Sequence, residues 1–249
     1  MRRHKRNSRL VDPAALAHAR PAPLPDAIEP QTARRAREVP RGSGWLYETK
    51  LEGVRVLARV AARGVRLLGV PNGLQPRALE RALAALPLDA ALLDGQLVAL
   101  RADGTSSLRQ LRDAFATGTP GALVYEVFDL LHLDGFDLTD VELVNRKRAL
   151  KTVLTGGGAL SNRGVVRYVH HFEGSGRELY AEVCRLGLPG LVCKLRTSRY
   201  RGGASAEWVD LDCADCVHDS HGEKARIERP RLVSAGYVRS RPAQRNERR

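Results

Sequence analysis

Trp-Leu-Tyr-Glu-Thr-Lys-Leu-Glu-Gly-Val-Arg, residues 45–55, is the stretch of sequence that decides the fold. An apolar, aromatic-rich strand ends at Lys50, and an acidic residue, a glycine and an arginine follow it closely. A lysine held rigidly at a strand end suits a nucleophilic amine. Glu52 and Arg55 would supply charge beside it, and Gly53 would let the backbone approach a bound ligand. The alternative is an ordinary edge strand with an exposed Lys-Glu pair.

The composition describes a chain long enough for one large domain or two small ones, with 249 residues of which 43% are hydrophobic and 5% aromatic. No apolar run approaches the roughly 20 residues that a membrane span needs. The basic N-terminus has no apolar stretch behind it, which argues against a secretory signal. Four cysteines without an evident pairing framework fit a reducing compartment, so we expect a cytoplasmic protein with no membrane partner.

The net charge of +13 is unevenly placed along the chain. Residues 1–44 hold ten Lys/Arg against four Asp/Glu, a net of +6, and residues 214–249 hold nine against five, a net of +4. Residues 45–213 hold 22 against 19, which is the remaining +3. Basic, apolar-poor ends are expected to be flexible and to bind DNA without reading its sequence. The alternative is that these ends only keep the protein soluble.

The pattern of apolar residues and turn signals predicts a mixture of strands and helices. Strands are expected at residues 45–50, 54–60, 65–68, 92–100, 122–131, 165–169, 190–194 and 208–211, and helices at 76–86, 107–116, 145–154 and 175–186. The first three strands suggest an antiparallel meander with Arg63-Gly64 at a turn. Because strands and helices do not alternate steadily, an α+β fold with antiparallel sheets is favoured over a doubly wound one.

Four further segments carry a pattern that continues in chain order from residues 45–55. They are Leu93-Asp94-Gly95-Gln96-Leu97-Val98-Ala99-Leu100, the aromatic strand Val124–Gly135 with Asn145-Arg146-Lys147 after it, Pro189-Gly190-Leu191-Val192-Cys193-Lys194, and Trp208-Val209-Asp210-Leu211-Asp212-Cys213. The series resembles the ordered motifs of the covalent nucleotidyltransferases, which are ATP-dependent DNA ligases, RNA ligases and mRNA capping enzymes. The segment Phe128-Asp129-Leu130-Leu131 favours a bacterial DNA ligase of the end-joining or repair type.

This resemblance implies a ligase-type nucleotidyltransferase core over residues 41–213, with antiparallel sheets flanked by helices. Residues 1–40, rich in proline and arginine, would form a basic arm, and residues 214–249 a flexible basic tail. Nothing after residue 213 resembles the OB-fold domain that usually follows in the family. DNA would be the main partner, together with other DNA-repair proteins.

The resemblance also implies a role for each residue that matches a motif. Lys50 would attack the α-phosphate of ATP and hold AMP through a phosphoramidate, and Lys194 would lie near the phosphates. Glu48 would recognise the adenine edge, Arg55 would contact the ribose, and Phe128 would stack on the base. The alternatives are a core role for Phe128 and an ordinary cross-strand charge at Glu48. ATP and Mg²⁺ would be the cofactors.

Several motif positions hold residues that the family does not use. Glu52 stands where an aspartate is usual, Gln96 and Pro189 stand where glutamates serve the metal and ribose side, and Asp210 and Asp212 replace two lysines that neutralise the triphosphate. An amide or a ring cannot supply the anionic oxygen that Mg²⁺ prefers, and two reversed charges repel a polyanion. Losing one preorganised charge already costs on the order of 10²–10³ in rate.

We therefore expect a ligase-like adenylation domain of DNA repair and recombination whose enzymatic activity is weak or lost. The alternative is a non-catalytic, DNA-binding pseudoenzyme that uses its basic arms. The last segment also contains Cys213, Cys216, His218 and His221, four residues that could ligate zinc. Their spacing is tighter than in zinc fingers, and we expect exposed tail residues and no metal there.

Overall fold

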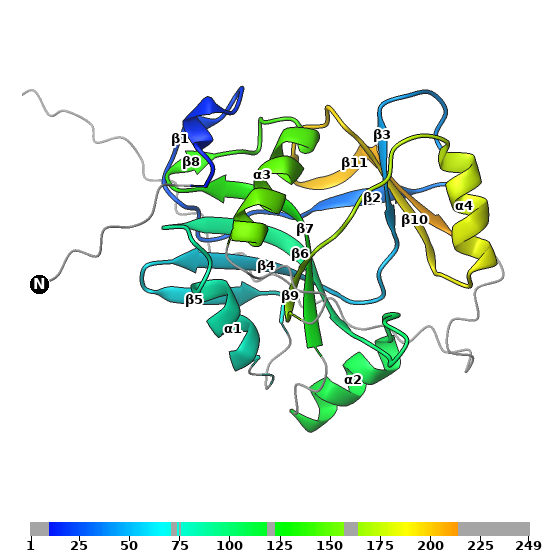
Figure 1. The fold of residues 1–249 in the computed structure, drawn as a ribbon, viewed down its shortest axis with the longest axis horizontal. Coiled ribbons are helices and arrows are strands. Elements are labelled where there is room, and N and C mark those ends of the chain that lie inside the picture. The colour runs from blue at the N-terminus through cyan, green and yellow to red at the C-terminus, as the bar shows by residue number, and fades with distance from the viewer. Residues whose placement is uncertain (1–9, 71–73, 75, 119–122, 157–163, 214–249) are drawn as a thin grey trace, which may run out of the picture.

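The computed structural model describes residues 10–70, 74, 76–118, 123–156 and 164–213 and arranges them around two sheets (Figure 1). In the larger sheet the strands follow the order β1 (Arg20–Pro21), β8 (Phe136–Asp137), β7 (Leu123–Leu133), β6 (Ala91–Ala99), β4 (Val54–Ala61) and β5 (Gly64–Leu68), and β9 (Val166–Tyr168) pairs with β7. In the smaller sheet the order is β2 (Gln31–Arg35), β11 (Gly203–Asp212), β10 (Gly190–Leu195) and β3 (Trp45–Thr49).

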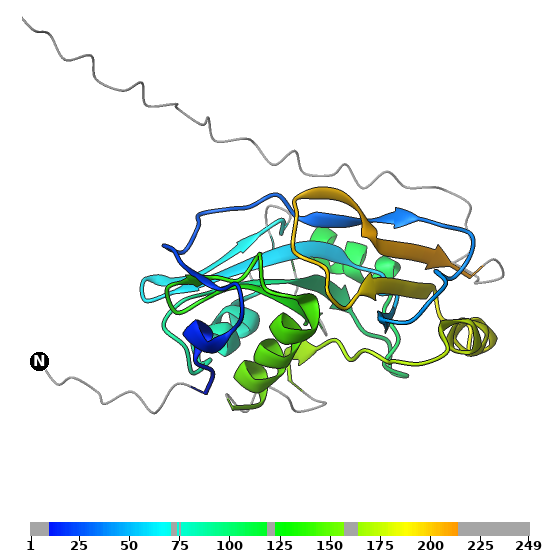
Figure 2. The ribbon, with the colours of Figure 1, turned by 90° about the horizontal axis from the view of Figure 1, so that it is seen from above.

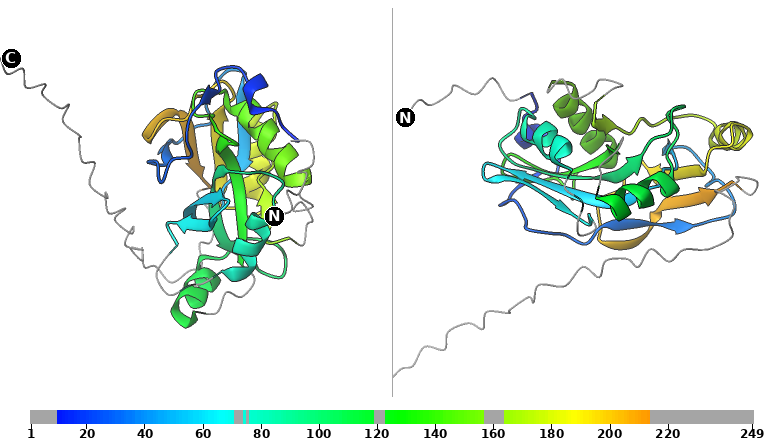
Figure 3. Two further views of the ribbon diagram at one scale, coloured as in Figure 1. Left: turned by 90° about the vertical axis from the view of Figure 1, so that its left-hand side faces the viewer. Right: turned by 90° about the horizontal axis from the view of Figure 1, so that it is seen from below.

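Four α-helices and one short 3₁₀-helix surround the sheets in the described part of the chain. They are η1 (Pro13–Ala15), α1 (Arg77–Ala84), α2 (Leu108–Thr117), α3 (Leu143–Gly156) and α4 (Gly176–Arg185). The view in Figure 2 shows the two sheets stacked, with α1 and α3 on the outer side of the seven-stranded sheet. α2 lies at one end of that sheet, where it contacts β6 (Figures 1 and 3). This is the α+β architecture that the sequence predicts.

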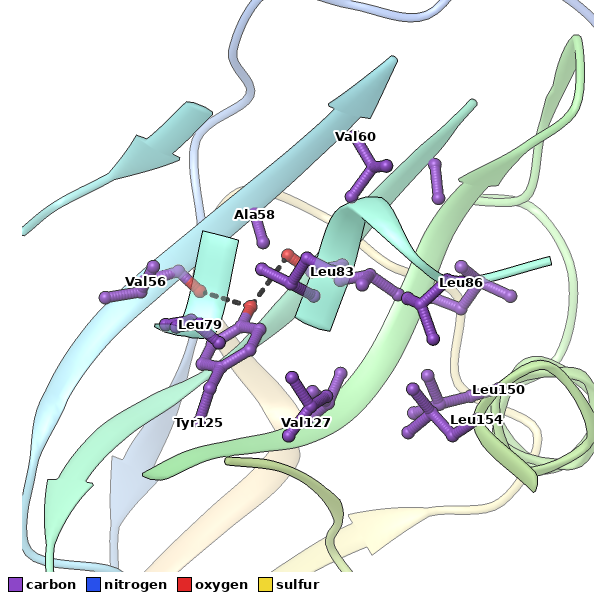
Figure 4. Close-up of a cluster of buried hydrophobic side chains, with 14 of the residues drawn as sticks. Val56, Ala58, Val60, Leu79, Leu83, Leu86, Tyr125, Val127, Leu150 and Leu154 are labelled. Carbon is purple, nitrogen blue, oxygen red and sulfur yellow. Dashed lines mark hydrogen bonds between the residues drawn. The ribbon is translucent and has the colours of Figure 1, made fainter. Parts of the chain in front are cut away.

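The main core fills the space between the seven-stranded sheet and the helices α1 and α3. Tyr125 reaches into it from β7 and donates its hydroxyl to the carbonyl oxygens of Val56 and Leu93, at 2.9 and 3.1 Å (Figure 4). Leu83 of α1 and Leu150 of α3 pack into the same cluster and are fully buried. A buried tyrosine needs such partners because an unpaired hydroxyl in an apolar core costs free energy.

Local sequence signals explain most of the element boundaries. The hydroxyl of Ser107 accepts a hydrogen bond from the Gln110 N–H and begins α2, which ends at Gly118 with φ of 66°. Ser175 begins α4 in the same way, and Gly64 turns the chain between β4 and β5 with φ of 123°. All four predicted helices and all eight predicted strands are present, with shifts of a few residues at their ends.

Three features of the fold differ from the sequence interpretation. The predicted meander over residues 45–68 is wrong at its first strand, because β3 pairs with β10 in the smaller sheet while β4 pairs with β5 and β6 in the larger one. The sheets are not purely antiparallel, since β9 runs parallel to β7 and β11 parallel to β2. Residues 31–35 form β2, so this part of the expected N-terminal arm belongs to the core.

Among the described residues, no helix is long and apolar enough to cross a bilayer.

Candidate active site

The smaller sheet has two faces of different character, because side chains alternate along each strand. On β11, Leu211 and the following Cys213 pack toward α4 in one apolar cluster. Trp208 points to the opposite face, toward the larger sheet, and Asp210 and Asp212 share its side of the strand. The polar side of this sheet therefore faces the space between the two sheets.

A cavity of about 330 Å³ occupies that space. Its lining includes Glu48, Lys50, Arg55, Gln96, Phe128, Lys194, Trp208 and Asp210. Seven of these eight are residues that the sequence marks as site positions, from strands far apart in the chain. Glu52 and Pro189 line a neighbouring cavity of about 510 Å³, and Lys50 lines both. The predicted site residues thus gather around one lysine.

Lys50 is held between the two aspartates of β11. Its Nζ lies 2.8 and 2.9 Å from the two carboxylate oxygens of Asp210, and it also pairs with Asp212. The register explains this contact, because Val192 of β10 stands opposite both Asp210 on one side and Glu48 on the other, which brings the ends of β3 and β11 together. Asp210 and Asp212, which the sequence predicts to face a triphosphate, contact the lysine itself in the structure.

A second ion cluster lies at the buried end of the cavity. The Glu48 carboxylate accepts hydrogen bonds from the Nζ atoms of Lys147 and Lys194, at 2.5 and 2.6 Å, and all three side chains are buried. Burial disfavours the charged form of Glu48, but the two ammonium groups outweigh it and lower the pKa of this carboxyl. Burial also disfavours the charged form of Lys194, and for this ammonium group that lowers the pKa to about 8, although the attraction of Glu48 acts in the opposite direction.

Lys147 is a site residue that the sequence analysis does not single out. It appears there only within Asn145-Arg146-Lys147, after the aromatic strand. Its Nζ also donates to the backbone carbonyl of Val169, at 3.1 Å. A buried lysine on an otherwise apolar helix face could have been recognised from the sequence, because such a side chain needs a partner.

Arg55, which lines the cavity, belongs to a third ion cluster. Its Nε and Nη2 donate to the two carboxylate oxygens of Asp94, each at 2.5 Å, and Tyr200 donates to the same carboxylate at 2.7 Å. The guanidinium also lies 4.6 Å from the ring centre of Phe128. Arg55 is therefore held in place by a bidentate pair and an aromatic face before any ligand arrives.

Phe128 is buried like a core residue and also lines the cavity, where its stacking on a base stays a prediction. The ring is 6% exposed and packs edge-to-face on Trp208 with centroids 6.1 Å apart, as a core residue does. It also lines the cavity, where Lys194 Nζ lies 3.9 Å from its ring centre. Cations already lie over this ring, so a base that stacks there has to displace at least one of them.

The residues of the cavity do not match the requirements of a magnesium ion. Mg²⁺ prefers carboxylate oxygens in octahedral geometry. The two carboxylates that line the cavity, Glu48 and Asp210, are each engaged by ammonium groups, and Gln96 offers only an amide. Pro189 in the neighbouring cavity offers no side-chain oxygen. The residues that line this cavity therefore do not form a magnesium site.

The interpretations of Gly53 and of the cysteines need correction. A Cβ on Gly53 would lie 2.5 Å from the Leu97 carbonyl oxygen, so this glycine allows β4 to approach β6 and lines neither cavity.

The sequence shows no cysteine pairing, but the structure joins Cys184 of α4 to Cys213 by a disulfide. Cys213 is thereby engaged, and Cys216, His218 and His221 lie outside the described residues. Among the described residues, no three potential metal ligands of the His, Cys, Asp or Glu type gather together.

Comparison with known proteins finds the same family signature over most of the chain. The model of the ATP dependent DNA ligase domain matches residues 30–211. The multifunctional non-homologous end joining protein LigD of Pseudomonas aeruginosa is 36% identical over 214 residues, which cover 80% of this chain and 25% of that protein. A probable DNA ligase of a Nocardioides species is 33% identical over 66% of this chain and 32% of that protein. The chain thus spans about a quarter to a third of the length of these relatives.

Solved structures show the same arrangement of sheets. The ligase domain of Mycobacterium tuberculosis LigD superposes with a TM-score of 0.59 at 25% identity, covering 74% of this chain and 60% of that one. A mycobacterial DNA ligase D complexed with ATP and MES superposes with a TM-score of 0.56 at the same identity, with the same shares covered. The Chlorella virus DNA ligase-adenylate, at 16% identity and a TM-score of 0.55, covers 74% of this chain and 69% of that one and shows the fold alone.

Proposed function

Because the chain belongs to the ATP-dependent DNA ligase family, we propose that it is the adenylation domain of an end-joining DNA ligase in which Lys50 is a poor acceptor of AMP. The end-joining role is supported by the LigD relatives. The impaired chemistry is supported by one observation above all: the lysine that should attack ATP is ion-paired with both Asp210 and Asp212.

The ion pairs affect each requirement of adenylyl transfer. A nucleophilic amine needs a free lone pair, and an ammonium that donates to two carboxylates has none to offer. The triphosphate carries up to four negative charges, and beside Lys50 it meets the carboxylates of Asp210 and Asp212, which Lys50 and the exposed Arg35 already pair with. The glutamates that serve the metal side of the site in the family are missing as well, because Gln96 and Pro189 stand in their places. These effects act on the same step, so we expect a large combined loss of rate.

We expect the departures from the family pattern to weaken nucleotide binding less than they weaken the transfer of AMP to Lys50. Arg55 is fixed beside the cavity by Asp94, and Phe128, Trp208 and Lys194 form a partly aromatic, partly cationic wall. We propose that the cavity still accepts the adenosine part of ATP, with Glu48 near the base and Arg55 near the ribose, and that the phosphates bind weakly.

The proposal is tested by restoring the family residues and following radiolabelled ATP into covalent protein. The variant Asp210→Lys/Asp212→Lys should bind ATP at least ten-fold more tightly than the natural chain, because binding needs charge. Adding Gln96→Glu and Pro189→Glu, with Mg²⁺ present, should raise covalent labelling by orders of magnitude. Lys50→Ala in the restored background is the matched control and should abolish the label. Efficient labelling of the natural chain, or no gain in a restored variant that folds, would contradict the proposal.

A second candidate function is DNA binding without ligation, which the charge distribution favours. The described core is close to neutral in charge, while the ends of the chain carry most of the net +13. Electrostatic binding of this kind requires no adenylate and is independent of the state of Lys50.

A further inference from the structure

We propose that the disulfide between Cys184 and Cys213 is a redox-controlled clamp that holds Asp212 against Lys50. The proposal rests on the proposed function in one respect, namely that the aspartates restrain the lysine. It adds a reversible chemical control over that restraint.

The disulfide is attached one residue away from the blocking carboxylate. Cys213 directly follows β11 and is 3% exposed, and its partner Cys184 lies near the end of α4, with 5.4 Å between their Cα atoms. Cys213 points toward α4 because residues alternate along the strand, so Asp212 points to the other face, where Lys50 is. The disulfide thus restrains Cys213, the residue directly after Asp212, and through the backbone it restrains the direction in which the Asp212 side chain points.

Noncovalent contacts also hold the end of this strand. The register of β11 with β2 ends at Asp210, and β10 pairs with Asp212 through Gly190. The Asp212 carboxylate also lies 3.7 Å from the Arg35 guanidinium. The Tyr180 hydroxyl of α4 donates to the backbone oxygen of Asp212 at 2.7 Å, and the Cys213 N–H donates to Pro189 at 3.0 Å. A strand end held from one side frays readily unless it is tied down. The disulfide is the covalent part of this attachment.

The chemistry of the switch is ordinary thiol–disulfide exchange. A dithiol reductant attacks the half-buried sulfur of Cys184, the Sγ–Sγ bond breaks, and Cys213 leaves as a thiolate that takes up a proton. The second thiol of the reductant then releases Cys184 and closes a cyclic disulfide. Two electrons and two protons pass from the dithiol to the two cysteines. Without the link, only noncovalent contacts join the end of β11 to α4, and Asp212 is held less firmly against Lys50.

Cys193 provides an internal control. It is the one free cysteine within the described residues and is buried on the α4 side of β10. Burial raises the pKa of its thiol to about 12, so at pH 8 it is a poor partner for exchange or alkylation. Cys216 also belongs to the full chain, so a redox response that survives the double substitution Cys193→Ala/Cys216→Ser must come from Cys184 and Cys213.

The test measures the reactivity of the Lys50 amine with a short pulse of an acetylating N-hydroxysuccinimide ester, followed by peptide mapping. The full chain is prepared oxidised, and separately reduced with dithiothreitol and desalted. Exposed Lys151 of α3 serves as the internal reference. We expect Lys50 acetylation to rise at least five-fold on reduction in the natural chain and in Cys193→Ala/Cys216→Ser. It should be high under both conditions in Cys184→Ser and in Asp212→Asn.

Equal acetylation of oxidised and reduced chains, or no Cys184–Cys213 link in peptide maps of the oxidised protein, would overturn the clamp. Because the natural chain is compared with itself, the result does not depend on a variant that folds. The labelling involves no ATP, so its outcome is separate from that of the proposed function. Adenylation could prove efficient while acetylation still responds to reduction, or remain poor while acetylation does not respond.

Discussion

At the scale of single residues, the Glu48 carboxylate compensates two buried ammonium groups, Lys147 and Lys194. The substitution Glu48→Gln leaves both lysines buried without a counter-ion in a volume that is nearly unchanged. Breaking a buried ion pair in this way costs about 3–5 kcal/mol. We therefore expect Glu48→Gln to lower the free energy of unfolding by about that amount, measured by urea denaturation at pH 7.

The matched control for this prediction is Asp140→Asn. Asp140 also pairs with two cations, Arg20 and Arg201, but at the exposed surface. Surface ion pairs contribute about 1 kcal/mol or less, so this variant should stay close to the natural chain. If the two variants lose the same free energy of unfolding, the buried cluster does not carry the weight given to it here.

The sequence identifies the members of the site but not their partners. Lys50, Asp210 and Asp212 are each identified through the resemblance of their segments to the ligase motifs. Their mutual contact depends on β10 lying between β3 and β11, and 160 residues separate Lys50 from Asp210. Long-range pairing of this kind is not contained in local periodicity. Charge reversal is visible in the sequence, whereas the ion pair that results from it requires the sheet order.

At the scale of elements, a buried arginine links α3 to β7 in addition to their apolar packing. Arg146 donates through Nε and Nη2 to both oxygens of Asp129, at 2.7 and 2.8 Å, and both side chains are fully buried. Replacing Arg146 by Met keeps the apolar contacts but leaves the carboxylate unpaired. We expect Arg146→Met to lower the free energy of unfolding by about 3–5 kcal/mol, measured by urea denaturation.

Arg148 on the same helix gives the comparison for this prediction. It is exposed, and its guanidinium donates to Asn145 only three residues away. Arg148→Met should change the free energy of unfolding by roughly 0.5 kcal/mol or less, as is usual for surface substitutions. A similar loss in both variants would show that α3 is sensitive to any arginine substitution and that the Asp129 pair has no special role.

Elements with strong local signals are predictable from the sequence, and those without such signals are not. α2 and α4 carry serine caps and apolar periodicity, so their positions follow directly. The sequence does not predict β2, because only one residue of Gln-Thr-Ala-Arg-Arg is buried and that residue, Gln31, is polar. Tertiary pairing with β11 makes it a strand despite its composition. The sheet to which β3 belongs is hidden for the same reason.

At the scale of the whole molecule, the ends of the chain carry the charge that would attract DNA. Residues 1–9 hold five Lys/Arg and no Asp/Glu, and residues 214–249 add a net of +4, so these ends hold +9 of the +13. Deletion of residues 1–40 would remove β2 from the core, and the cut is therefore placed after residue 9. We expect the chain trimmed to 10–213 to bind duplex DNA at least ten-fold more weakly, with a shallower salt dependence.

Fluorescence anisotropy with a labelled duplex at several salt concentrations measures this difference. Unchanged circular dichroism and thermal midpoint in the trimmed chain would show that its core is intact. Equal affinity of the full and trimmed chains at matched salt would mean that the core, with its net charge of +4 from +13 less +9, binds the DNA itself.

Across the whole molecule, each charged residue expected to hold ATP is already engaged in an ion pair within the protein. Lys50 is paired with the β11 aspartates, Glu48 with Lys147 and Lys194, and Arg55 with Asp94. Only the first of these clusters involves the residues that depart from the family pattern. We therefore attribute the proposed loss of adenylation mainly to that cluster, and we propose that the other two serve folding and the binding of base and ribose.

The fraction of natural chain that carries AMP on Lys50 tests this claim most directly. Oxidised, purified protein is incubated with saturating ATP and Mg²⁺, and intact-mass spectrometry with peptide mapping gives the occupancy. Because the amine is held by two carboxylates and the phosphates are repelled, we predict an adenylated fraction below about 1% after an hour. Adenylation of most of the chains at Lys50 under these conditions would contradict the account and show that the ion pairs open readily when ATP binds.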